Sequence, residues 1–176
     1  DFLDKFKEKT ESLSVGDPNT EQTVLGAVVN QSAADKVHSL VQDAVDHGAR
    51  LLTGGKGEGT ILPPAILDGV TPEMRIYAEE SFGPVVSVIR ANDTEHAVQL
   101  ANDTEYGLSA AVFGRDIPRA LGVAQRIDSG ICHVNSPTVQ DEAQMPFGGT
   151  KASGYGRFGG RAVPSIRGSA ETAPAS

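Results

Sequence analysis

Two segments in the first half of the chain carry apolar residues at the helical period. Residues 1–14 place Phe2, Leu3, Phe6 and Leu13 roughly on one side of a helix. This pattern begins at the first residue without a visible cap, so we expect the chain to have been cut from a longer one. Residues 32–47 predict the clearest helix, because their apolar positions recur every three or four residues; they are Ala33, Val37, Leu40, Val41, Ala44 and Val45. Gly48 is well suited to end it.

From residue 49 onward, short apolar segments alternate with further helical ones. Extended segments are predicted at 49–55, 61–70, 85–91, 108–114 and 129–135. One helix is predicted from Asp93 or Thr94 to about Asn102. Another follows Asp116, with Pro118 in its first turn, where a missing N–H costs little. Strands and helices that alternate in this way favour an α/β fold with mainly parallel strands.

The pattern changes after residue 136. Residues 136–160 are rich in glycine and are predicted to form loops. Residues 161–176 are small and polar, contain proline and follow no period, so we predict a disordered or aberrant tail. The expected organisation is therefore one domain over 1–160 followed by a tail over 161–176.

Composition excludes several classes of protein. The 176 residues suffice for one domain, and the net charge of −8 argues against a nucleic-acid surface. No apolar stretch approaches the length that spans a membrane. A single cysteine excludes an intrachain disulfide and indicates a reducing compartment. We therefore expect a cytoplasmic protein that binds neither nucleic acid nor membrane.

Two glycine-rich motifs resemble nucleotide-binding loops. GYGRFG at 154–159 fits the dinucleotide fingerprint G-x-G-x-x-G, but no strand leads into it and Pro164 disfavours a following helix. We interpret it as a loop with close backbone packing. GGKGEG at 54–59 lacks the Ser or Thr that should follow the lysine of a phosphate loop. It is predicted to be a hairpin or surface loop.

Candidate catalytic groups are few. Cys132 is the only thiol, and its neighbour His133 should point to the opposite face of a strand, where it cannot act as the base. Cys132 is therefore predicted to be a small buried residue. The four histidines are scattered, and no spacing predicts a metal site. Glu79 and Glu80 are either an acid/base pair or a solvated helix end, and composition cannot choose between these.

Several motifs together resemble the aldehyde dehydrogenase superfamily. These are LSVGDP (13–18), GARLLTGG (48–55), EESFGPV (79–85), ANDTEYGLSAAVFGRD (101–116), SGICHVN (129–135) and MPFGGTKASGYGRFGG (145–160). They follow the family's order and spacing from residue 1 to about 160. The resemblance implies part of a catalytic domain with an open, mainly parallel sheet and helices on both faces. It also implies oxidation of an aldehyde to the carboxylic acid with NAD or NADP.

The resemblance assigns roles to particular residues. Glu80 matches the carboxylate that binds the nicotinamide ribose, and Phe82 the aromatic beside the nicotinamide ring. Phe147 matches an aromatic of the aldehyde tunnel, and Thr138 and Val139 belong to the loop over 136–144 that borders it. The stretch around this loop resembles the branch that acts on aromatic aldehydes, the salicylaldehyde and vanillin dehydrogenases.

Other parts of the family pattern are absent from the chain. The nucleophilic cysteine, its base and the cofactor-binding domain lie upstream of the matched region, so no catalytic residue is assigned, and Cys132 does not match the nucleophile. The family is homo-oligomeric, but residues 161–176 replace its oligomerisation strand, which a frameshift or a truncated gene would explain. The isolated chain is expected to be inactive. The alternatives are a non-catalytic relic or interaction module that docks on full-length subunits, or a folded remnant.

Overall fold

The computed structural model describes residues 1–19, 22–140, 142 and 144–159. The chain divides into two compact units, Asp1–Arg90 and Ala91–Ser176. The tail predicted over 161–176 lies outside the described residues.

The first unit is a three-stranded sheet with helices. Its elements are α1 (Phe2–Glu11), α2 (Gln31–Asp46), β1 (Arg50–Thr53), β2 (Ala65–Asp68), α3 (Arg75–Ala78) and β3 (Val85–Val88). The strand order is β1-β2-β3; β2 and β3 run parallel, whereas β1 is antiparallel to β2. Asn30 caps α2, because its side-chain Oδ1 accepts from the Ala33 N–H at 2.9 Å.

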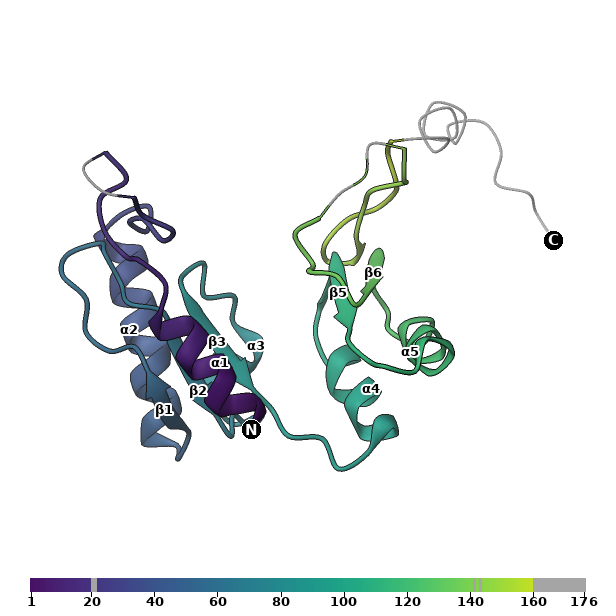
Figure 1. Ribbon diagram of the computed structural model, residues 1–176, viewed down its shortest axis with the longest axis horizontal. Coiled ribbons are helices and arrows are strands. Elements are labelled where there is room, and N and C mark those ends of the chain that lie inside the picture. Colours follow the sequence, from purple (N-terminus) through teal and green to yellow (C-terminus); the bar gives the residue numbers. More distant parts are fainter. Residues whose placement is uncertain (20–21, 141, 143, 160–176) are drawn as a thin grey trace. The chain divides into compact units, whose positions relative to one another are not determined.

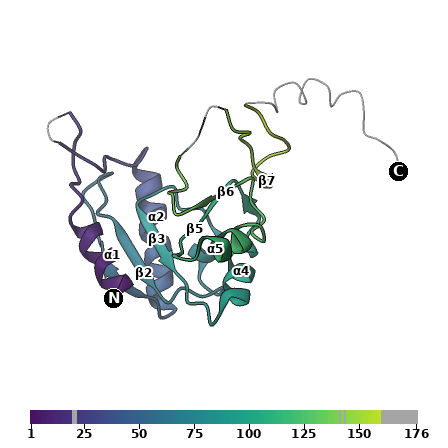
Figure 2. The same cartoon turned by 45° about the vertical axis from the view of Figure 1, so that its right-hand side comes forward.

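The core of this unit forms between α2 and the sheet. Leu40 and Ala44 of α2 pack in one buried cluster with Leu67 of β2. Ile66 and Leu67 are neighbours on β2, so they face opposite sides of the sheet, yet both are 0% exposed. Both faces of β2 are therefore covered. Figures 1 and 2 show α1 and α2 on opposite sides of the sheet.

A buried carboxylate ties the sheet together. Asp68, at the end of β2, pairs with Arg50 of β1 and accepts two hydrogen bonds from Arg90 Nη2 at 2.9 Å. The Arg50 and Arg90 guanidinium groups hold the pKa of Asp68 below its usual value, against the opposing effect of burial. A buried charge is tolerated here because it is paired with groups on both sides.

The second unit contains α4 (Thr94–Asn102), β4 (Tyr106–Gly107), β5 (Ser109–Val112), α5 (Ile117–Ala124), β6 (Ile131–Val134) and β7 (Thr150–Lys151). Strands β5 and β6 pair in parallel, with α5 as their crossover, and β4 pairs antiparallel with β7. The Asp93 and Asp116 side chains cap α4 and α5, accepting from backbone N–H groups at 2.8 and 3.1 Å. Pro118 lies in the first turn of α5, as predicted.

The structure confirms the α/β class and most predicted elements. Within the part of the chain that the structure describes, the strands form three small sheets, and the strand pairs β2–β3 and β5–β6 are parallel. Residues 154–159 pack closely against the backbone, as predicted: a Cβ on Gly148 would lie 2.0 Å from the Gly156 carbonyl oxygen. The predicted 54–59 loop runs into a tight turn over 58–61, which a bridge between Glu58 and Ile61 closes. Within the described residues, no helix is both long and apolar enough to cross a bilayer.

Candidate functional site

The EESFGP turn connects α3 to the entrance of β3. Glu79 is the C-terminal cap of α3, and Val85 begins the strand. The Pro84 carbonyl accepts from the Ala65 N–H of β2 at 2.8 Å, which fixes the strand at its first residue. Gly83 lies against α2 so closely that a Cβ would be 2.3 Å from Val37 Cγ2. The turn therefore needs glycine at this position to approach the helix.

The two carboxylates of this turn have different environments. Glu79 accepts hydrogen bonds from Arg75 Nε at 2.8 Å and Nη2 at 3.2 Å. This contact lowers the pKa of Glu79. Glu80 is exposed, and its carboxylate has no partner in the described part of the chain. Glu79 is therefore committed to an ion pair, whereas Glu80 offers a free carboxylate.

Phe82 presents its ring to solvent. Its side chain is 80% exposed, and its backbone φ of +50° lies in the left-handed region. A bulky residue adopts this conformation only at a cost, and such strain is concentrated at functional sites. Burial does not repay the cost here, so the exposed ring is a candidate ligand contact.

The predicted substrate residues lie in the second unit. Val139 is 95% exposed, and the Thr138 carbonyl accepts from Ser109 Oγ at 3.0 Å. The ring of Phe147 lies 5.2 Å from that of Phe158. Asn135 anchors the start of the loop, because its side chain accepts from the Gly114 N–H at 2.8 Å and donates to the Gly114 carbonyl at 2.9 Å.

A cavity of about 490 Å³ lies beside β6. Its lining residues are Gly130, Ile131, Cys132, His133, Gln140, Glu142, Met145, Pro146 and Arg157. None of the three predicted substrate residues lines it. Burial raises the pKa of the Cys132 thiol, which disfavours the thiolate that a nucleophile needs. His133 Nε2 is buried without a hydrogen-bond partner among the described residues.

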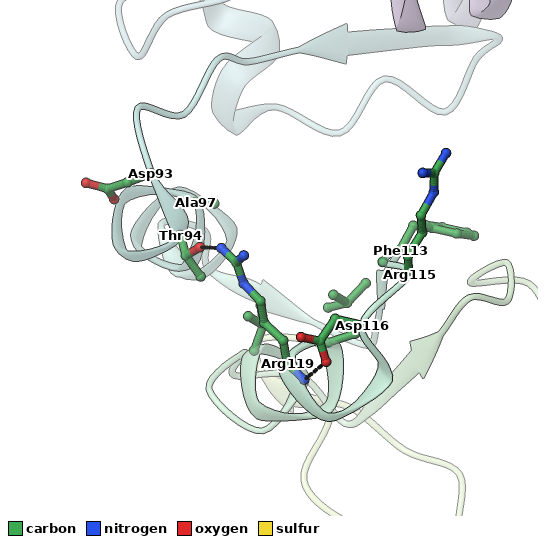
Figure 3. Close-up of a pocket in the computed structure, with 11 residues that line it drawn as sticks. Asp93, Thr94, Ala97, Phe113, Arg115, Asp116 and Arg119 are labelled. Atoms are coloured by element: carbon green, nitrogen blue, oxygen red, sulfur yellow. Dashed lines mark hydrogen bonds between the residues drawn. The ribbon is translucent and has the colours of Figure 1, made fainter.

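A second cavity, of about 540 Å³, lies between the first turns of α4 and α5 and the end of β5 (Figure 3). Arg119 Nη2 donates to Thr94 Oγ1 at 2.9 Å, and the side chains of Asp93 and Asp116 are engaged in helix caps. Its described lining includes no cysteine, serine or histidine. The cavity therefore has an apolar floor and a charged rim, and its Thr94 hydroxyl and two carboxylates are already engaged in protein hydrogen bonds. Across the described residues, no three histidine, cysteine or acidic side chains converge to hold a metal ion.

The chain matches known proteins along nearly its whole length. The sequence model of the aldehyde dehydrogenase family matches residues 1–165. A vanillin dehydrogenase from Pseudomonas fluorescens is 57% identical over 161 residues, which are 92% of this chain and 33% of that protein. The structure of a salicylaldehyde dehydrogenase from Pseudomonas putida G7, complexed with salicylaldehyde, superposes with a TM-score of 0.90 at 50% identity, covering 94% of this chain and 34% of that one.

A more distant structure extends the comparison to a nucleotide complex. An NADP-dependent glyceraldehyde-3-phosphate dehydrogenase from Bacillus halodurans C-125, complexed with NADP, superposes with a TM-score of 0.86 at 38% identity and covers 91% of this chain and 33% of that one. The chain belongs to the aldehyde dehydrogenase family. It spans about a third of the length of the relatives it matches.

Three residues next to the EESFGP turn escaped the sequence analysis. They are Lys36 and Asp43 of α2, and Arg75 of α3, which all contact the turn or its helix. The spacing of Arg75 and Glu79, four residues apart, is a helical ion-pair signal that could have been found. Lys36 lies 44 residues before its partner Glu80, and no local pattern indicates that contact.

Proposed function

We propose that this chain is part of an NAD(P)-dependent dehydrogenase that oxidises an aromatic aldehyde to the carboxylic acid. The observation that carries the proposal is the EESFGP turn. In it, Arg75 pairs with the Glu79 carboxylate, whereas the side chains of Glu80 and Phe82 are exposed. The 57% identity to a vanillin dehydrogenase supports it. In the overall reaction, aldehyde, water and NAD(P)⁺ give the acid, NAD(P)H and a proton.

The turn has the chemistry that a nicotinamide nucleotide requires. A free carboxylate such as that of Glu80 accepts hydrogen bonds from both hydroxyls of a ribose. The exposed ring of Phe82 offers a flat apolar face to a planar base. The nucleotide supplies the hydride acceptor when bound. In our proposal Glu80 and Phe82 hold and orient it, and residues 1–160 form part of the catalytic domain.

The second unit would provide part of the aldehyde site. Thr138 and Val139 project from a loop whose start is fixed by Asn135 and Gly114, so the loop can vary in sequence without moving its anchor. Phe147 packs on Phe158 and presents an aromatic surface. An aromatic aldehyde suits this lining because ring–ring contacts add to simple apolar burial.

A chimera tests the proposal directly. The matching segment of the Pseudomonas fluorescens vanillin dehydrogenase is replaced by residues 1–159 of this chain, and NADH and NADPH formation are measured with vanillin, salicylaldehyde and an aliphatic aldehyde. We expect turnover that favours the aromatic substrates. Glu80→Gln should raise the KM for the nucleotide about tenfold, a loss of roughly 1.4 kcal/mol of binding. A folded chimera that reduces no nucleotide would contradict the proposal.

The isolated chain should form no NADH with any aldehyde, because no thiolate nucleophile is assigned in it. A second candidate function is docking on full-length subunits of the family. Exposed apolar residues of the second unit favour this candidate, among them Leu108, Phe113, Ile117 and Leu121. Co-elution of the chain with an intact relative would support it, and a monodisperse chain that does not co-elute would argue against it. A cytoplasmic location and homo-oligomerisation remain part of the proposal for the whole protein.

A further inference from the structure

One face of α2 contacts α3 and the EESFGP turn through three polar side chains. Lys36, Ser39 and Asp43 are spaced three and four residues apart, so they lie along the same side of the helix. Each of them contacts either α3 or the turn that follows it. We call these three residues, together with Arg75 and Glu79, the α2–α3 clamp.

Arg75 is the centre of the clamp. Its backbone N–H donates to Asp43 Oδ2 at 2.9 Å, which fixes the first residue of α3. Its guanidinium donates to Ser39 Oγ through Nη1 at 2.9 Å and to Glu79 through Nε and Nη2. A guanidinium is rigid and planar, so contacts on two edges define its orientation. The Glu79 side chain is thereby held against α3, and the Arg75 guanidinium neutralises the charge of its carboxylate.

Lys36 holds the next residue by its backbone. Lys36 Nζ donates to the Glu80 carbonyl oxygen at 2.7 Å. Beyond it, the close approach of Gly83 to Val37 fixes the other end of the turn. The backbone around Glu80 and Phe82 is therefore held on both sides by α2, while the two side chains themselves are left without protein partners among the described residues.

We propose that Arg75 is a positioning residue for nucleotide binding. Because Arg75 pairs with the Glu79 carboxylate, Glu80 is the one carboxylate of the turn left to bind the nicotinamide ribose. This inference rests on the proposed function. Without Arg75, two adjacent carboxylates would compete for the same hydroxyls and repel each other. Lys36 fixes the carbonyl of Glu80 and so limits the directions that the Glu80 side chain can take.

The first test uses the isolated chain and needs no activity. Arg75→Met and Lys36→Met are compared with the unsubstituted chain by hydrogen exchange at the Glu79 and Val85 amides, which donate to the Arg75 and Gly83 carbonyls. We expect exchange at least fivefold faster in both variants. Arg126→Met is the matched control, because Arg126 also forms a two-pronged pair with a glutamate, Glu95, but in the second unit. Unchanged exchange in both variants would overturn the clamp.

The second test uses the chimera described above. Arg75→Met should raise the KM for the nucleotide roughly five- to tenfold, while kcat and the KM for the aldehyde change less than twofold. Arg75→Lys should restore part of the nucleotide affinity. The control, Arg126→Met, should change none of these constants. A nucleotide KM within twofold of the unsubstituted chimera would overturn the positioning role. An inactive unsubstituted chimera would count against the proposed function alone, and the hydrogen-exchange result would then decide the clamp.

Discussion

At the scale of single residues, Phe82 combines two unfavourable features. Its ring is 80% exposed, and its backbone is left-handed at φ +50°. Asparagine tolerates this conformation far better than a bulky aromatic residue does. We therefore expect Phe82→Asn to raise the free energy of unfolding of the chain by about 0.5–1 kcal/mol. Urea denaturation measures this difference.

Phe113→Asn is the control for that substitution. Phe113 is 69% exposed, but its φ is not positive, so asparagine relieves no strain there. If Phe82→Asn destabilises the chain, the Phe82 ring contributes packing and the strain argument fails. If it stabilises the chain yet weakens nucleotide binding in the chimera, the strain is retained for function.

Asp68 shows how a single charge links stability to pH. Its pairing with Arg50 and Arg90 lowers its pKa in the folded chain below the unfolded value, which is near 3.8. The stabilisation is therefore present above the unfolded pKa and is lost as the pH falls through the folded pKa. Asp68→Asn should lower the free energy of unfolding at neutral pH, because it removes the charge that both arginines bind. We expect a loss limited to about 2 kcal/mol, because both arginines are largely exposed and solvent screens the interaction.

The difference between Asp68→Asn and the unsubstituted chain should shrink as the pH falls below 3.8, because protonated aspartic acid then resembles asparagine. Urea titrations over this range measure the difference. A gap that persists unchanged at low pH would mean that the substitution acts by disturbing packing rather than by removing the charge.

The sequence pointed to candidate residues of the site but gave no account of how their contacts differ. The family resemblance implies that Glu80 and Phe82 contact the nucleotide, which stays a prediction, and the structure leaves both exposed. The distinction between Glu79 and Glu80 depends on α3, a helix of only four residues that no periodicity reveals. It also depends on Asp43 and Lys36, which approach through tertiary packing. Contacts of this kind have no local signature.

At the scale of elements, α5 illustrates which features are encoded locally. Asp116 and Pro118 predicted its start, and the structure confirms both. Gly122 lies inside this helix, and a Cβ added there would meet nothing within 4 Å beyond its chain neighbours and the backbone of its own helix. Gly122→Ala should therefore raise the free energy of unfolding by about 0.5–1 kcal/mol, because glycine has more backbone freedom to lose on folding.

Gly130, which precedes β6, should respond in the opposite direction. A Cβ there would lie 1.7 Å from the Gly148 carbonyl oxygen, and a backbone atom cannot move aside cheaply. We expect Gly130→Ala to lower the free energy of unfolding by about 2 kcal/mol or more. Thermal and urea unfolding of the two variants, compared side by side, measure both effects. Equal effects of the two substitutions would refute the close-packing argument.

Strand pairing was less predictable than helix boundaries. Residues 49–55 were predicted as a strand, and the structure forms β1 there. Its antiparallel pairing with β2 was not predicted, because the direction of a strand depends on its partner and not on its own sequence. β4 and β7 contain two residues each, too few for any alternation to register. Lys151 in β7 donates to the carbonyls of Asn102 and Thr104, so a contact distant in sequence fixes it. Capping side chains mark the starts of α2, α4 and α5, whereas the short strands depend on partners far along the chain.

At the scale of the whole molecule, burial is distributed unevenly. Fifteen hydrophobic residues are buried in the described part of the chain, and twelve of them lie in Asp1–Arg90. The second unit contributes only Val98, Ala120 and Ala124. Apolar burial is the main favourable term in folding, so the second unit has much less to stabilise it. The relatives are about three times longer, and we propose that their remaining residues would cover its exposed apolar side chains.

This asymmetry predicts that the two units open with different free energies. In the isolated chain, two amides at the ends of β6, those of Ile131 and Asn135, donate to carbonyls of Leu108 and Val112. They should exchange at least about tenfold faster than the Ala65 and Gly69 amides at the ends of β2, after correction for intrinsic rates. Native-state hydrogen exchange measures the ratio. In the chimera the ratio should fall if, as we propose, the remaining residues of the longer protein cover the exposed apolar side chains of the second unit. Equal protection in the isolated chain would mean that the two units unfold as one, and that the few buried residues of the second unit underestimate its stability.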